Sequence, residues 1–139
     1  MFQRLNPVPV NWVIAPNGAT NISADTTIAV LKAEFDGQII GAGFAQIQTE
    51  IAASSTTYAN ISILNGGASG TGTTAMATVD IGNAATAAAF SIHDLTISST
   101  ADDTKFSADD YICVKYDETG ALELGPIEGA FSIIYGYES

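Results

Sequence analysis

Apolar and polar positions alternate along this chain in the pattern of short β-strands. Val, Ile, Thr, Tyr and Phe gather in short runs, and Gly, Asn, Asp and Ser separate one run from the next. No segment keeps the 3.6-residue apolar period of an amphipathic helix. We therefore predict strands over residues 10–14, 26–33, 38–48, 58–64, 73–79, 91–98, 111–116 and 131–137. This spacing is typical of an antiparallel β-sandwich of the jelly-roll kind, an all-β fold in a single domain.

The two predicted strands nearest the C-terminus show which residues share a face, because successive side chains of a strand point to opposite sides. In the first strand, the residues on one face are Ile112, Val114 and Tyr116, and those on the other are Tyr111, Cys113 and Lys115. In the second, the aromatic face that we expect to enter the core carries Phe131, Ile133, Tyr135 and Tyr137. We expect Cys113 to face a neighbouring sheet or a subunit.

The segments between the strands predict an arm, a loop, a helical turn and a hairpin. Residues 1–9 form an extended N-terminal arm, because Pro7 and Pro9 lack a backbone donor and keep their predecessors extended. Residues 65–74 form a glycine-rich loop, and the alanines of 84–89 favour one helical turn. Residues 117–120 form a hairpin turn in which Gly120 adopts positive φ. The domain limits are therefore 1–9 for the arm and 10–139 for the sandwich.

Length and charge restrict the class of protein. A chain of 139 residues makes one domain. Its formal net charge of −11 argues against nucleic acid and anionic membranes as partners. Apolar residues make up 47% of the chain, which excludes the disordered acidic class. The mean hydropathy of +0.24 is high for a small domain, so we expect other chains to cover part of its surface, although an alanine-rich sequence also raises this average.

Cysteine content and apolar run lengths predict a protein made in the cytoplasm. The lone cysteine, Cys113, has no partner for an internal disulfide. Near the N-terminus Asn6, Pro7, Pro9 and Asn11 interrupt any run of signal-peptide length. No apolar run approaches the roughly 20 residues of a membrane helix.

Candidate catalytic and cofactor motifs are incomplete. The glycine-rich segment lacks the Lys that follows the last glycine of a P-loop, because Thr73 follows Gly72. His93 is the only imidazole, and no G-x-S-x-G nucleophile elbow accompanies it. One His and one Cys cannot complete a zinc site of such ligands within the chain. We therefore expect a non-catalytic protein without a cofactor.

An acidic cluster leaves two interpretations open. Four carboxylates surround Phe106 in the sequence: Asp102, Asp103, Asp109 and Asp110. Carboxylates at short spacing can bind calcium, but the ligand order of an EF-hand is missing. The alternative, which we favour, is that these side chains cap turns and keep a loop solvated, with no metal bound. Paired carboxylates for glycoside hydrolysis would need an aromatic cleft, and Trp12 is the only tryptophan.

Three stretches of the chain resemble small bacteriophage virion proteins. They are residues 63–67 running into the following GTGTT, the segment 106–120, and the closing AFSIIYGYES. The middle segment resembles the strand-entry pattern F-x-A-G-D-x-I-x-V of decoration and fibre domains, matched by Phe106, Ala108, Asp110, Ile112 and Val114. Asp109 stands where that pattern has glycine; Asp tolerates left-handed φ better than most residues.

The resemblance implies a capsid decoration, or cement, protein. Such a protein is a homotrimer on the outer capsid surface that bridges adjacent copies of the major capsid protein. In this chain we expect the arm and its neighbourhood to bury apolar surface on another chain, through Phe2, Leu5, Val8, Pro9 and Trp12. Three alternatives remain: a tail, neck or head-fibre component; a carbohydrate-binding module that uses Tyr58, Tyr135 or Tyr137; and, least favoured, an enzyme.

Overall fold

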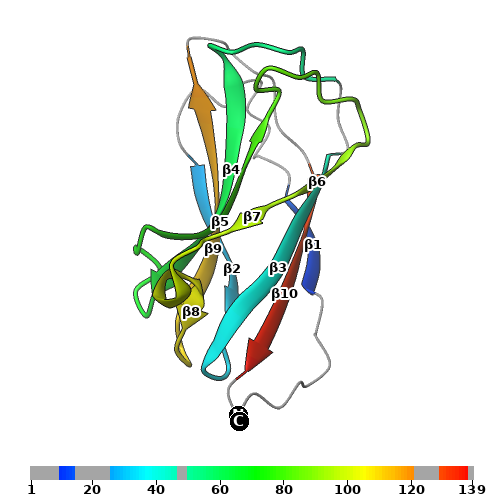
Figure 1. Ribbon diagram of the computed structural model, residues 1–139. Coiled ribbons are helices and arrows are strands. Elements are labelled where there is room, and N and C mark those ends of the chain that lie inside the picture. The colour runs from blue at the N-terminus through cyan, green and yellow to red at the C-terminus, as the bar shows by residue number, and fades with distance from the viewer. Residues whose placement is uncertain (1–9, 15–25, 47–49, 121–128, 138–139) are drawn as a thin grey trace.

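Two antiparallel β-sheets pack face to face in the computed structural model, which describes residues 10–14, 26–46, 50–120 and 129–137 (Figure 1). The strands are β1 Val10–Ile14, β2 Thr26–Lys32, β3 Gly37–Gln46, β4 Tyr58–Gly67, β5 Thr74–Ile81, β6 Ile92–Asp94, β7 Thr96–Ile97, β8 Lys105–Phe106, β9 Tyr111–Thr119 and β10 Gly129–Tyr137. A short 3-10 helix, η1, spans Ala101–Thr104.

The strand order is that of a jelly roll. One sheet, here called sheet A, has the order β1-β10-β3-β6, with β8 also paired to β3. The other, sheet B, has the order β2-β9-β4-β5-β7. The antiparallel partners are nested along the sequence: β1 pairs with β10, β2 with β9, β3 with β6 and β4 with β5. A folded ribbon of nested pairs is how a jelly roll is built, so the predicted fold class is confirmed.

Aromatic side chains join the two sheets at the centre of the core. Phe44 and Phe131 of sheet A lie with ring centroids 4.9 Å apart, and Tyr116 of sheet B meets both edge-on. All three are buried. The face predicted for the first C-terminal strand is confirmed, because Ile112 and Val114 are buried beside Tyr116. In the second strand Phe131 and Ile133 are buried, Tyr135 is half-buried, and the side chain of Tyr137 lies outside the described residues.

The predicted strand 91–98 was wrong, because the chain changes sheets in its middle. β6 pairs with β3 in sheet A, whereas β7 pairs with β5 in sheet B. Between them Leu95 is buried, and its backbone N–H donates to the carbonyl of Ala42. Figure 1 shows β7 running on from β6 across the molecule toward β5. An apolar residue between two short strands marks the crossing, but strand alternation alone does not separate it from a continuous strand.

The predicted hairpin turn at 117–120 and loop at 65–74 were each partly wrong. β9 continues to Thr119, because its last residues pair with the start of β4. Gly120 follows with φ +95, so its predicted positive φ is confirmed although the turn begins later. At the other end β4 continues to Gly67, where Tyr111 of β9 is its partner, and the loop is correspondingly shorter.

The predicted helical turn at 84–89 was also wrong. Isolated bridges join Ile51 to Ala87 and Ser54 to Asn83. The N–H of Ile51 donates to Ala87 O, and the N–H of Ala87 donates to Ile51 O. These tertiary hydrogen bonds outweigh the helical preference of a short alanine run, which is too weak to form a helix alone. Residues 1–9, the predicted arm, lie outside the described residues.

A bulge in β3 reverses the side-chain alternation along that strand. Ile134 pairs with Gly41 and Tyr135 with Ile39, so Ile40 is the extra residue on β3. Phe44 and Ile39 are both buried, although an odd number of positions separates them. Ile40 is left 57% exposed. A bulge of this kind re-aims one side chain without interrupting the sheet.

Replacement of Gly129 by Ala should destabilise the fold. A Cβ at Gly129 would run into the ring of the buried Phe44, and into the carbonyl of Ala45. Neither neighbour can withdraw, because one is core and the other is backbone. We expect Gly129→Ala to lower the free energy of unfolding by about 1–3 kcal/mol, measured by denaturant titration. Gly136→Ala on the same strand is the control, since a Cβ there meets nothing within 4 Å; equal stability of the two variants would contradict the prediction.

Candidate interaction surface

The outer face of sheet A carries mostly small and apolar side chains. We call its described outward positions on β3, β6 and β10 the sheet A face: Gln38, Ile40, Gly41, Gly43, Ala45, Ile92, Asp94, Ala130, Ser132, Ile134 and Gly136. Asp94 is its one charged residue. Ile40 and Ile92 are 57% and 76% exposed, and Ile134 lies against Gly41.

Local sequence explains this face. The inward positions of β10 take Phe131 and Ile133, so the alternate positions, from Ala130 to Gly136, turn outward. Gly43 pairs with Ser132, and Ala45 with Ala130, so small residues lie beside small residues across the two long strands. The bulge adds Ile40 to the same side. Glycine and alanine weaken an exposed strand unless something packs against it, because they bring little surface of their own.

A face of this composition is unusual on an acidic protein. The outer face of an antiparallel sheet normally carries polar side chains when it meets water. Here fifteen acidic residues give the chain its charge, yet the sheet A face contains only Asp94. Exposed apolar patches of this kind mark surfaces that bind other proteins. The geometry therefore provides a docking surface that carries a single charge, at Asp94.

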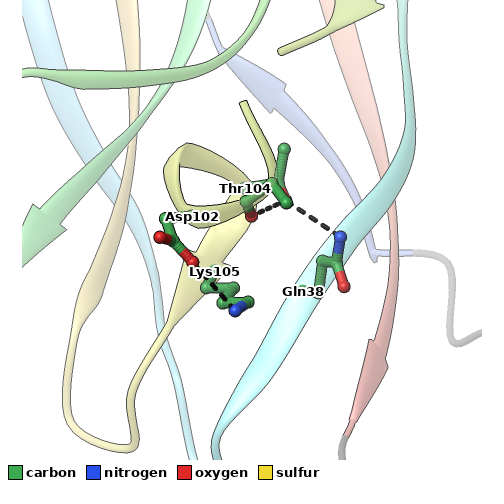
Figure 2. Close-up of polar contacts among 5 residues, drawn as sticks. Gln38, Asp102, Thr104 and Lys105 are labelled. Atoms are coloured by element: carbon green, nitrogen blue, oxygen red, sulfur yellow. Dashed lines mark hydrogen bonds and ion pairs between the residues drawn. The ribbon is translucent and has the colours of Figure 1, made fainter. Parts of the chain in front are cut away.

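The three lysines of the chain are each placed beside an aspartate. Lys32 Nζ lies 2.8 Å from Asp109 Oδ1, Lys105 Nζ lies 2.9 Å from Asp102 Oδ1, and Lys115 Nζ lies 3.0 Å from Asp117 Oδ2. Figure 2 shows the second pair, at the end of the 3-10 helix η1, beside the bond from Gln38 of β3 to Thr104. Exposed pairs of this kind contribute little to stability. Because each lysine is paired with an aspartate, the described surface has no cluster of unpaired positive charges.

The four carboxylates around Phe106 do not share a partner. Asp102 and Asp109 take the lysines above, and these hydrogen bonds lower the pKa of each carboxyl. Asp103 accepts a hydrogen bond from Ser98. Asp110 accepts from the backbone N–H of Ser107 at 2.8 Å and from Asn65 at 3.3 Å. Only Asp110 caps a turn, through the backbone N–H of Ser107, so the predicted turn caps are confirmed for one of the four carboxylates. In the described ranges, no group of three or more His, Cys, Asp or Glu could hold a metal ion.

The segment that resembles virion proteins has the backbone conformation its pattern requires. Asp109 occupies the glycine position, and its φ is +73, in the left-handed region. Its N–H donates to Ala33 O at 2.8 Å, which ties the turn to the end of β2. Phe106, Ile112 and Val114 of the same pattern are buried. The structure therefore confirms that Asp109 takes a conformation usually reserved for glycine.

His93 belongs to a hydrogen-bonded turn. Ser91 Oγ lies 2.6 Å from the carbonyl oxygen of Ala88 and 2.8 Å from His93 Nε2. The hydroxyl has one proton, and a carbonyl can only accept, so the proton goes to Ala88 and Nε2–H donates to the hydroxyl. Partial burial lowers the pKa of the imidazole. In this arrangement His93 has no free Nε2 lone pair with which to activate Ser91, and the contact orients the turn.

Cys113 faces the chain's own glycine-rich loop and not a neighbouring sheet, which corrects the expectation. Its sulfur lies 3.8 Å from Gly70 O, and a Cβ on Gly66 would come within 2.7 Å of it. Burial raises the pKa of the thiol. The loop's amides are also occupied, since Gly70 N–H and Gly72 N–H donate to Gly67 O and Gly66 O. A phosphate would have to displace these bonds.

Of the tyrosines in the carbohydrate alternative, the two whose side chains the structure describes, Tyr58 and Tyr135, are both partly buried. Tyr135 packs between Phe35 and Phe106, with centroids at 5.5 and 6.1 Å. Tyr58 is half-buried, and the side chain of Tyr137 lies outside the described residues.

Most of the predicted interface residues lie outside the residues that the structure describes. Phe2, Leu5, Val8 and Pro9 lie outside the described residues. Trp12 lies in β1, where its backbone pairs with Phe131, and its side chain is outside the description. The prediction for these residues stays a prediction. Sequence reasoning missed the sheet A face, although the small residues Gly41, Gly43 and Ala45 recur at every second position of a predicted strand.

Comparisons with known proteins found a weak similarity in structure but none in sequence. No family model matches the chain, and no curated protein matches it. Among solved structures, one entitled "Structure of infectious bursal disease virus Gx strain" is similar over 95% of this chain with a TM-score of 0.38 and 14% identity. The chain spans 34% of that chain, about a third of its length. A helix able to cross a membrane is absent from the described ranges.

Replacement of Asp109 should separate the contribution of its backbone conformation to stability from the contribution of its ion pair with Lys32. Glycine adopts φ +73 without steric cost, whereas a β-branched residue does not. We expect Asp109→Gly to unfold at the same temperature as the parent chain or above it, although the contact with Lys32 is lost. Asp109→Val should unfold at a temperature about 5 °C lower. Thermal unfolding followed by circular dichroism measures both; a destabilised glycine variant would show that the ion pair matters more than the φ angle.

Proposed function

We propose that this protein is a non-catalytic structural component of a virion, which binds other protein chains through the sheet A face. The observation that carries the proposal is this face of mostly small and apolar side chains, with Asp94 as its one charge, on a jelly roll of net charge −11. Jelly rolls occur in viral capsid proteins and in lectins, so the fold alone does not choose between these functions. The face favours a protein partner, because its side chains are mostly small or apolar and offer few hydrogen bonds to a sugar.

The proposed site of action is the outside of a phage capsid. There the protein bridges adjacent copies of the major capsid protein and stabilises the shell. The support is the resemblance of residues 106–114 to decoration domains, together with the left-handed Asp109 in that segment. The partner surface is apolar and carries less negative charge than this chain, because two acidic surfaces would repel each other. The chain is made in the bacterial host cytoplasm and acts as a homotrimer.

A second location in the virion is a tail, neck or head fibre, which the same fold and face would serve. A carbohydrate-binding role is less favoured, because Tyr135 is packed between two phenylalanines.

A negative charge at Ile40 should weaken docking without affecting the fold. Ile40 is exposed and lies on the sheet A face, so Ile40→Asp leaves the core intact and places a carboxylate in an apolar contact. We expect its affinity for empty shells of the major capsid protein encoded with this chain to fall at least about tenfold, measured by co-sedimentation. Docking should also raise the melting temperature of the shell for the parent chain and less for the variant.

Thr27→Asp is the matched control for this experiment. Thr27 is exposed on β2 of sheet B and receives the same added charge. It should bind the shells as the parent chain does. Equal loss of binding in both variants would point to overall charge and not to the sheet A face, and unchanged binding of Ile40→Asp would overturn the proposed surface.

Deletion of the arm tests the remaining predicted interface. If Phe2, Leu5, Val8 and Pro9 bury apolar surface on the capsid, a chain lacking residues 1–9 should unfold as before but lose its binding to the shells. Co-sedimentation and thermal unfolding measure the two properties separately. Retained binding would remove the arm from the interface and leave the sheet A face as the contact.

A further inference from the structure

A single exposed aromatic ring projects from the turn that precedes β6. Phe90 is 77% exposed, the most exposed of the large apolar residues described. Its φ is +61, a left-handed conformation that is costly for a bulky side chain. The hydrogen bonds from Ser91 to Ala88 O and between Ser91 and His93 fix the turn on its C-terminal side. A strained backbone that presents an apolar ring to solvent indicates a rigid anchor for another surface.

An aromatic pocket lies at the connection between β2 and β3. It encloses about 220 Å³ and is lined by Leu31, Lys32, Ala33, Glu34, Phe35, Phe106 and Tyr135. A cavity of about 150 Å³ is enough to hold benzene, so a phenyl ring fits this space. The rings of Phe35 and Phe106 both pack on Tyr135, which offers an entering ring edge-on and tilted contacts. Two charged residues, Lys32 and Glu34, also line the pocket, and Lys32 is paired with Asp109.

The ring and the pocket of one chain cannot meet. On β3, Ala45 pairs with Ile92 beside the turn, whereas Gly37 pairs with Phe106 beside the pocket. These two positions of β3 are separated by about 25 Å of extended strand. Figure 1 shows β6 toward one end of the molecule and the β2–β3 connection at the other. Only a second chain can bring a Phe90 ring to this pocket.

We propose that Phe90 of one copy inserts into the pocket formed by Phe35, Phe106 and Tyr135 of the next copy. The contact is head-to-tail, so each copy uses its ring once and its pocket once. Such contacts close into a ring when the rotation between copies allows it, and three copies give the proposed homotrimer. The inference rests on the proposed function only for the homotrimer. The proposed docking on the capsid uses a different surface, the sheet A face.

Three single variants, and a mixture of a ring variant with a pocket variant, test the contact. Phe90→Gly removes the ring and suits positive φ, so this variant should unfold at the parent temperature or above it. Phe35→Ala removes one wall of the pocket, and Phe35→Leu is a second variant that keeps an apolar side chain there. We expect light scattering to give a trimer for the parent chain and monomers for each variant alone. An equimolar mixture of ring and pocket variants should form a complex of two chains, because one intact ring meets one intact pocket and the chain of contacts then ends.

Ile40→Ala is the control, since it removes an exposed apolar side chain from the outer face of sheet A, whereas Tyr135 of the pocket lies on the inner face, and it should leave the trimer intact. A Phe90→Gly variant that keeps the parent mass would overturn the contact but not the trimer. A mixture that stays monomeric would overturn it as well. A parent chain that is monomeric at all concentrations would overturn both the contact and the trimer, whereas capsid docking would still be decided by co-sedimentation of Ile40→Asp.

Discussion

The two sheets of this protein are held together by an aromatic contact at the centre of the sandwich. Tyr116 of sheet B meets Phe44 and Phe131 of sheet A, and all three rings are buried. Aromatic pairs of this kind contribute about 0.5–1.5 kcal/mol each beyond the apolar area that they bury. The Tyr116 hydroxyl has no hydrogen-bond partner among the described residues, and burial raises its pKa. The packing of the Tyr116 ring therefore carries this contact, and the buried hydroxyl adds no hydrogen bond to it.

This contact also decides which side of sheet A meets other molecules. Because Phe44 and Phe131 must point inward, the alternate positions of β3 and β10 must point outward, and these are mostly glycine, alanine, serine and isoleucine. The bulge at Ile40 then restores an inward Ile39 at the far end of β3. The surface proposed for docking is therefore the reverse side of the core, and a substitution that shifts the register of β3 would alter both.

The fold class was predictable because it depends on local alternation. The predicted strands correspond closely to β1, β2, β3, β4, β5, β9 and β10, and they differ from them by a few residues at their ends. The left-handed conformation at Asp109 was also foreseeable, because the strand-entry pattern that residues 106–114 resemble has glycine at this position. The crossing between sheets at Leu95 was not foreseeable, because an apolar residue between two apolar runs is also typical of one continuous strand. The prediction of a helical turn at 84–89 was wrong for a related reason: the bridges in this region pair it with residues 51–54, which are distant in the sequence.

The sequence by itself determined that this chain folds as an antiparallel β-sandwich with aromatic residues inside, because alternation with a period of two is a local property. It also determined the acidic charge and the absence of complete catalytic motifs. Only the tertiary structure decided the nested strand order, the bulge that exposes Ile40, and the placement of Phe90 and the aromatic pocket at opposite ends of β3. These features depend on which distant strands pair and in what register, and pairing energies between distant strands are shared among many residues that no single segment contains.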